Sequence, residues 1–221
     1  LATAASCSIW AMSPVFPPFV NEALMERYTP LFLDEERWYV GCVALTDGHS
    51  GSDVENVDGT HGRYIRTTAT RDGDEWVVNG HKLWPTNSGG HADLFMVVCT
   101  TDAEGGDDAV AIIYVPADAP GVTQGAPYRK AGMAADANGD IWFDNVRVPL
   151  ENRAHGPGVD AERARAMISS GNVGTAATCL GVMRNLYEIV RDWCDTRMIA
   201  GRRLKDHSIT AAVLSDIVSA I

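Results

Sequence analysis

The sequence predicts an α+β protein with more than one domain, in which a central β-barrel or sandwich-like domain is flanked by helical segments. Short β-rich runs separated by turn residues fill the middle of the chain, from Trp38 to Val148. Before Trp38 and after Pro149, apolar residues recur at helical spacing instead. With 221 residues, the chain is long enough for roughly one or two such domains.

Residues 1–37 are expected to form a loop followed by a short helix. They begin with an apolar run and a proline cluster, after which Leu24, Met25 and Tyr28 recur at helical spacing. The apolar run lacks a basic first part and is soon interrupted by prolines, which disfavours a signal peptide. The chain starts without a methionine and ends inside an apolar periodic stretch, so we expect it to be a piece of a longer protein.

The β-rich runs between residues 38 and 150 are expected to be the strands of the central domain. Asp72-Gly73-Asp74 lies between two of them and is typical of a tight hairpin turn. The polar segment Asp102–Asp108 is expected to be a solvated loop between two others. No helix-length pattern separates the runs and no G-x-G-x-x-G follows one, which disfavours a Rossmann domain. The expected strands are Tyr39–Leu45, Tyr64–Thr70, Glu75–Asn79, Phe95–Thr100, Ala109–Val115 and Ile141–Phe143.

Residues 151–221 are expected to be helical. Glu162–Ser169 leads into Val173–Thr196, and Ile209–Ile221 repeats the helical pattern after a turn around Gly201. The apolar residues that recur at spacings of three and four in the longer segment are Leu180, Met183, Leu186, Tyr187, Val190 and Cys194.

Charge and composition exclude several classes of function. The net charge of −11 disfavours nucleic acid and anionic membrane surfaces as partners, although backbone N–H groups and one or two arginines can still hold a nucleotide. No apolar run approaches the ~18 residues of a membrane-spanning helix. The five cysteines and six histidines show no spacing typical of a metal site, so we expect reduced thiols and no metal. Gly51-Ser52 lacks the G-x-S-x-G elbow of serine hydrolases.

Two segments carry a resemblance to a known family. Ala44–Asp53 has the sequence ALTDGHSGSD, and Asn79–Asn87 has the sequence NGHKLWPTN. Together and in this order they resemble the flavin-binding signatures of the acyl-CoA dehydrogenase family, in which both are loop ends of one small β-domain and converge on the isoalloxazine ring. The resemblance continues through Lys130–Met133 and Ile141–Pro149 and covers the chain from Ala44 onward.

This resemblance implies a division into domains. Residues 1–37 would be the tail of an N-terminal helical domain, and residues 38–150 would be the β-domain that binds the flavin. Residues 151–221 would be the first helices of a C-terminal four-helix bundle.

The resemblance also implies roles for residues in the two signatures. Leu45 and Thr46 would contact the pyrimidine side of FAD, and Ser52 would stand near the FAD pyrophosphate or the arm of the CoA substrate. Trp84 would pack beside the flavin, and the Thr86 hydroxyl would reach toward N5. For Thr46–Ser52, an ordinary surface loop remains the alternative. From the residues alone, Trp84 and Thr86 would share one face of a strand, and a core tryptophan remains the alternative for Trp84.

Arg197 and Asn172 are the site residues that the resemblance implies in the helical part. Arg197 would reach the FAD pyrophosphate of a neighbouring subunit; the alternative is a solvated arginine favoured by the end of a helix. Asn172 replaces an arginine of most family members and is expected on the substrate side. Gly171 occupies the place of an alternative catalytic glutamate and cannot act as a base, so we expect the base beyond Ile221.

Other departures from the family are local. Asp47-Gly48 stands where the family most often has Glu-Pro, which is expected to loosen the loop while keeping a carboxylate. Pro85 suggests a strand end, and Ser208 replaces a glutamine. Glu162, the nearest upstream carboxylate to Gly171, is expected to be a surface residue.

The function implied is that of an FAD-dependent acyl-CoA dehydrogenase, which desaturates an acyl-CoA thioester by α-proton abstraction and β-hydride transfer to flavin N5. The alternatives are a subunit of a heteromeric acyl-CoA dehydrogenase with a degenerate site, another flavin-dependent oxidase or monooxygenase on the same fold, and a β-domain binding module without catalysis. The partners implied are an acyl-CoA thioester, electron-transfer flavoprotein or another acceptor, and further chains of a homo- or hetero-tetramer. The implied location is the cytoplasm, or the mitochondrial matrix in a eukaryote.

Overall fold

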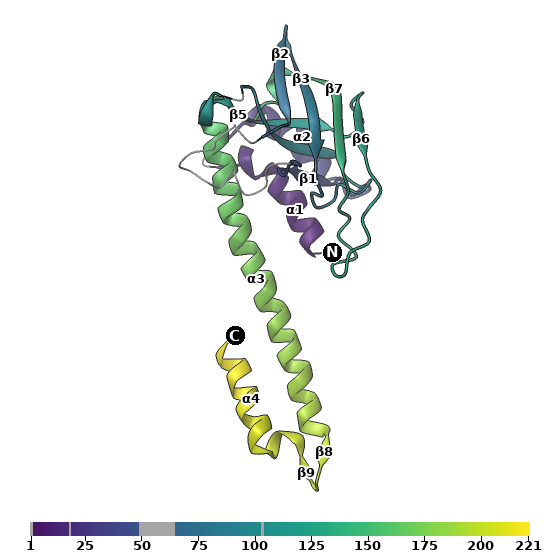
Figure 1. Cartoon of the computed structure of the whole chain (residues 1–221), viewed down its shortest axis with the longest axis vertical. Helices are drawn as coiled ribbons and strands as arrows, with labels where there is room; N and C mark the ends of the chain where they lie inside the picture. The colour runs from purple at the N-terminus through teal and green to yellow at the C-terminus, as the bar shows by residue number, and fades with distance from the viewer. Residues whose placement is uncertain (1, 18, 49–64, 103) are drawn as a thin grey trace. The chain divides into compact units, whose positions relative to one another are not determined.

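The computed structural model describes residues 2–17, 19–48, 65–102 and 104–221 (Figure 1). The chain divides into two compact units, Leu1–Ile168 and Ser169–Ile221. The first is called the β unit below, and the second the helical unit.

Two helices precede the sheet of the β unit. The helix α1 covers Ala2–Met12 and α2 covers Glu22–Phe32. The Asn21 side chain accepts a hydrogen bond from the backbone N–H of Leu24 at 3.1 Å and so caps the start of α2. The helix expected after the proline cluster is therefore confirmed. The sequence did not predict α1, which forms because Ala11 and Met12 pack into the core.

The β unit contains a curled seven-stranded sheet, as expected of a barrel-like domain. Its path is β1-β4-β2-β3-β7-β6, with β5 paired to β4. The pairs β1–β4 and β2–β4 are parallel, and the other pairs are antiparallel. The strands are β1 (Gly41–Ala44), β2 (Thr68–Asp72), β3 (Glu75–Lys82), β4 (Leu94–Thr100), β5 (Val110–Pro116), β6 (Val122–Gln124) and β7 (Ile141–Pro149).

The turn expected at Gly73 joins β2 to β3, because Asp72 pairs directly with Glu75. The expected acidic loop joins β4 to β5 and contains a short 3-10 turn at Gly106–Ala109. Within this loop the Asp107 carboxylate accepts two hydrogen bonds from Arg165. At least one acidic side chain of the loop is therefore paired with a cation rather than only solvated.

The central strands β4 and β5 are buried on both faces, which explains their continuous apolar sequence. One face of each strand packs into a cluster that also contains residues of α1, α2 and the start of α3 (Val159–Thr196). The other face packs into the hollow of the curled sheet with residues of β1, β3 and β7. Two apolar layers thus stabilise the sheet, so the loops at its ends need not contribute to the core.

The segments expected at Glu162–Ser169 and Val173–Thr196 form one continuous helix, α3. The helical unit begins within this helix, at Ser169. A hairpin of β8 (Met198–Ile199) and β9 (Arg202–Arg203) follows, and then α4 (Ser208–Ser219), as expected. Within the described part of the chain, no helix is both long and apolar enough to cross a membrane.

Candidate functional site

The described part of the first signature, Ala44–Gly48, lies beside the second signature at one end of the sheet. Leu45 and Thr46 directly follow β1, and Leu83 directly follows β3. The backbone N–H of Leu83 donates to the carbonyl of Thr46 at 2.9 Å, and Asp47 forms an antiparallel bridge with Lys82. The convergence expected of these segments is therefore present in the fold.

A buried ion pair holds the two segments together. Lys82 Nζ lies 2.9 Å from Asp47 Oδ1, and both side chains are fully buried. The ammonium also donates to the carbonyl of Leu45 at 2.8 Å. Burial lowers the pKa of Lys82, and the charge of Asp47 opposes that shift. The backbone of Leu45 is thus fixed by a side chain of the other signature.

Asp47 also holds the start of the segment that leads into β2. Its carboxylate accepts hydrogen bonds from the Thr67 hydroxyl at 2.7 Å and from the backbone N–H of Arg66 at 2.8 Å. The carboxylate expected at Asp47 is therefore present and ties three segments together, while the loop after Gly48 lies outside the described residues. The sequence analysis recognised the carboxylate but missed its partner, Lys82.

Trp84 and Thr86 follow the strand rather than lying on it. The strand β3 ends at Lys82, and Trp84 has a φ of 57° in the left-handed region, so the argument that both side chains share one strand face is wrong. Pro85 correctly indicated the strand end. The backbone of Trp84 is held instead by Asn138 and Gly139: its carbonyl accepts from Asn138 Nδ2 at 2.7 Å, and its N–H donates to Gly139 at 3.2 Å.

The hydroxyl of Thr86 is oriented by a buried carboxylate. Thr86 Oγ1 donates to Asp136 Oδ2 at 3.3 Å, and Asp136 is only 7% exposed. Lys130 Nζ lies 3.4 Å from the same carboxylate oxygen and donates to the Asp136 carbonyl at 2.5 Å. In this orientation the Thr86 oxygen can still accept a hydrogen bond, and rotation of the hydroxyl lets it donate one instead.

A groove with apolar walls lies beside Trp84. The Trp84 ring is 55% exposed and meets the Tyr128 ring edge to face, with centroids 6.4 Å apart. The alternative of a core tryptophan is therefore wrong. Apolar walls with a few polar groups suit a flat ring that carries hydrogen-bonding atoms. The groove has a volume of about 660 Å³ and is lined by Trp84, Tyr128, Lys130, Gly132, Met133, Asp136 and Asn138.

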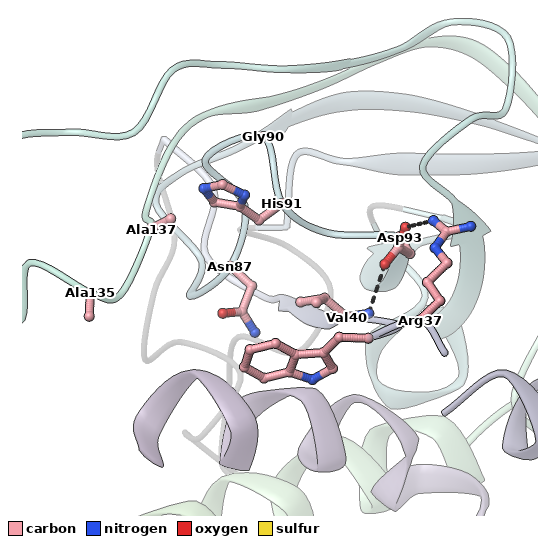
Figure 2. Close-up of a pocket in the computed structure, with 9 residues that line it drawn as sticks. Arg37, Val40, Asn87, Gly90, His91, Asp93, Ala135 and Ala137 are labelled. Carbon is pink, nitrogen blue, oxygen red and sulfur yellow. Dashed lines mark hydrogen bonds and ion pairs between the residues drawn. The ribbon is translucent and has the colours of Figure 1, made fainter. Parts of the chain in front are cut away.

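A second hollow, of about 400 Å³, lies beyond Asn87 in the same loop (Figure 2). Figure 2 shows the Asp93 carboxylate between Arg37 and the backbone of Val40, to which it is hydrogen bonded at 2.5 and 2.8 Å. Asn87 donates to the carbonyl of Gly41 at 2.9 Å. These hydrogen bonds therefore attach the loop to β1 and to the residue before it. The sequence did not predict this hollow.

The remaining predicted site residues do not join the groove residues within the β unit. Ser52 lies outside the described residues. Asn172 and Arg197 are both exposed and belong to the helical unit, where about 36 Å of α3 separates them at 1.5 Å per residue. Glu162 is exposed, as expected.

The cysteines are unpaired, as the sequence predicts. All five cysteines are free thiols. No group of three or more His, Cys, Asp or Glu side chains among the described residues could hold a metal ion.

Comparison with known proteins shows what the central part of the β unit is similar to. Residues 42–146 match the acyl-CoA dehydrogenase middle domain. The chain is 29% identical over 201 residues to an acyl-CoA dehydrogenase of Bacillus subtilis, covering 91% of this chain and 50% of that relative. The chain thus spans about half the length of that curated relative.

Solved structures share the fold. Butyryl-CoA dehydrogenase from Megasphaera elsdenii has a TM-score of 0.87 at 24% identity, covering 99% of this chain and 54% of that one. A nitroalkane oxidase mutant has a TM-score of 0.86 at 22% identity, covering 99% and 55%. These proteins differ in chemistry, so the fold alone leaves the reaction open.

Proposed function

We propose that this chain, whose residues 42–146 match the acyl-CoA dehydrogenase middle domain, is part of an FAD-dependent enzyme that desaturates an acyl-CoA thioester between its α and β carbons. Bound FAD would supply the hydride acceptor for this oxidation. The proposal rests on one observation, the convergence of the Thr46 and Trp84 segments beside an apolar groove.

The residues of the β unit fit the isoalloxazine ring. Leu45 and Thr46 would bind its pyrimidine side, because the Asp47–Lys82 pair fixes their backbone. The exposed ring of Trp84 would cover its apolar part. The Thr86 hydroxyl would lie toward N5, an acceptor in the oxidised ring, and would donate to it by turning its proton away from Asp136.

Among the described residues, neither Asp136, which lines the groove, nor Asp47 nearby is available as the base that removes the α-proton. Asp47 is buried against Lys82, and Asp136 is buried against Lys130 and Thr86. A general base must lie within hydrogen-bond reach of the proton that it removes. We therefore propose that the base comes from a segment outside residues 1–221.

The proposed partners follow from the same assignment. They are the acyl-CoA thioester, electron-transfer flavoprotein or another electron acceptor, and further chains of a homo- or hetero-tetramer. The proposed location is the cytoplasm, or the mitochondrial matrix in a eukaryote.

The visible spectrum of the purified protein tests the proposal. We expect a flavin band near roughly 450 nm that is bleached by anaerobic addition of at least one acyl-CoA thioester from a panel of chain lengths. Absence of any bound flavin, with no binding of added FAD, would refute the cofactor assignment. A flavin that no thioester bleaches would refute the dehydrogenase and favour a degenerate subunit or another flavin reaction.

A pair of tryptophan variants tests the place of the site. Trp84→Ala is expected to raise the dissociation constant of FAD about tenfold, because it removes the aromatic wall of the groove. Trp142→Ala is the matched control, since Trp142 is also exposed, at 40%, but stacks on His81 and does not line the groove. Equal effects of the two substitutions would contradict the assignment of the groove.

A further inference from the structure

The hairpin of the helical unit presents three exposed arginines in a chain of net charge −11. They are Arg197, Arg202 and Arg203. The hairpin turns at Ala200 and Gly201, which both have positive φ, at 49° and 76°. Met198 pairs with Arg203, and Ile199 pairs with Arg202.

The pairing places two of these arginines on the same face. The backbone N–H of Leu204 donates to the carbonyl of Arg197 at 2.7 Å, which extends the antiparallel register by one pair. Side chains directly opposite each other share a face, and faces alternate along each strand. Arg197 and Arg202 therefore lie on one face as diagonal neighbours, with Cα atoms about 7–8 Å apart, and Arg203 lies on the opposite face.

The two faces also differ in charge. Near Arg203, whose charge acts on Asp195, Lys205 forms an ion pair with Asp195 at 2.5 Å. The pKa of Asp195 is lowered first by Lys205 and further by the charges of Arg203 and Arg191. No carboxylate in the described part of the chain forms an ion pair with Arg197 or Arg202. The face shared by Arg197 and Arg202 thus carries two positive charges that no acidic side chain neutralises.

We propose that Arg202 is a second diphosphate-binding residue, which together with Arg197 binds the pyrophosphate of the FAD held by a neighbouring subunit. This inference rests on the proposed function, in which FAD is the cofactor. Two guanidinium groups at this spacing can each form paired hydrogen bonds with one phosphate of a diphosphate. A local pair of this kind overcomes the unfavourable net charge of the chain toward an anion.

Two variants of equal charge test the inference. Arg202→Gln and Arg203→Gln each remove one positive charge from the same hairpin, but only Arg202 lies on the face of Arg197. The dissociation constants of FAD and of riboflavin are measured on the purified apoprotein by flavin fluorescence. We expect Arg202→Gln to weaken FAD binding about tenfold and Arg203→Gln to change it less than about twofold. Riboflavin lacks the diphosphate, so its binding should be the same in both variants.

The outcomes separate the inference from the proposed function. Equal losses of FAD affinity in both variants, or a loss that extends to riboflavin in Arg202→Gln, would overturn the role of Arg202 and leave the cofactor assignment in place. A wild-type protein that binds neither FAD nor riboflavin would overturn the cofactor assignment, and the role of Arg202 with it.

Discussion

The β unit and the helical unit treat charged and apolar side chains in opposite ways. The β unit buries Asp47 and Lys82 as a pair and packs its apolar residues into two clusters. The helical unit leaves Arg197 and Arg202 exposed, together with large apolar residues such as Leu186 and Trp193. Exposed apolar surface on this scale is typical of a surface that packs against further protein. The contacts of the β unit therefore explain its own structure, whereas the helical unit presents groups suited to binding.

The largest expected effect concerns the buried pair of the β unit. Lys82→Met leaves Asp47 buried without its cation and is expected to lower the free energy of unfolding by about 3–5 kcal/mol. Urea unfolding, followed by tryptophan fluorescence, measures the loss. A loss below about 1 kcal/mol, as for an exposed pair, would show that the buried pair contributes no more to stability than an exposed one, and that the β unit does not depend on it.

Two controls refine this measurement. Asp47→Asn combined with Lys82→Met removes both charges while keeping an acceptor for Thr67, and it should recover most of the loss. Arg147 pairs with Asp72 and Glu75 on the surface of the sheet, at 2.6 and 3.0 Å. Arg147→Ala should therefore leave the urea midpoint almost unchanged, because the pair is exposed to solvent.

An intermediate effect is expected from Tyr39, a neutral group of the β unit. Burial is the main cause that raises the pKa of Tyr39 to about 12, with smaller contributions from neighbouring Tyr28 and Asp93. The unfolded tyrosine ionises near about 10, so the unfolded state loses its proton first. The stability that Tyr39 contributes is thus complete below pH ~10 and is lost as the pH rises to about 12.

Tyr39→Phe should remove this contribution and flatten the dependence of unfolding free energy on pH in that window. Urea unfolding at intervals between pH ~9 and ~12 measures the slope. An unchanged slope would show that Tyr39 is ionised as easily in the folded as in the unfolded chain, and that its burial has no consequence for stability.

The regular helices and strands were predictable because the secondary-structure preferences of their own residues agree with the fold. β-branched and aromatic residues fill β4 and β5, and Asn21 and Gly73 mark a helix start and a turn. In contrast, α1 contains mostly small residues and no clear apolar stripe. The strand β6 has three residues, too few for an alternating pattern.

The candidate site was predictable only in part. The signatures identified Thr46 and Trp84, and the structure brings their segments together. The pairing of Asp47 with Lys82 depends on strands that are distant in sequence, so no local pattern indicates it. The positive φ of Trp84 is rare for a large residue and is maintained by contacts with Asn138 and Gly139, which the sequence does not place nearby.

The smallest expected effect tests the exposure of the helical unit. A Cβ atom added at Gly181 in α3 would meet no atom within 4 Å. Gly181→Ala should therefore stabilise the helix by about 0.5–1 kcal/mol, since alanine loses less backbone freedom on folding. Gly73→Ala is the matched control: its Cβ is equally unobstructed, but its φ of 61° makes the substitution destabilising. Thermal unfolding monitored by circular dichroism at several protein concentrations measures both. If Gly181→Ala instead destabilises the protein, a neighbouring segment or chain packs closely against Gly181, and the exposure that distinguishes the helical unit is lost on assembly.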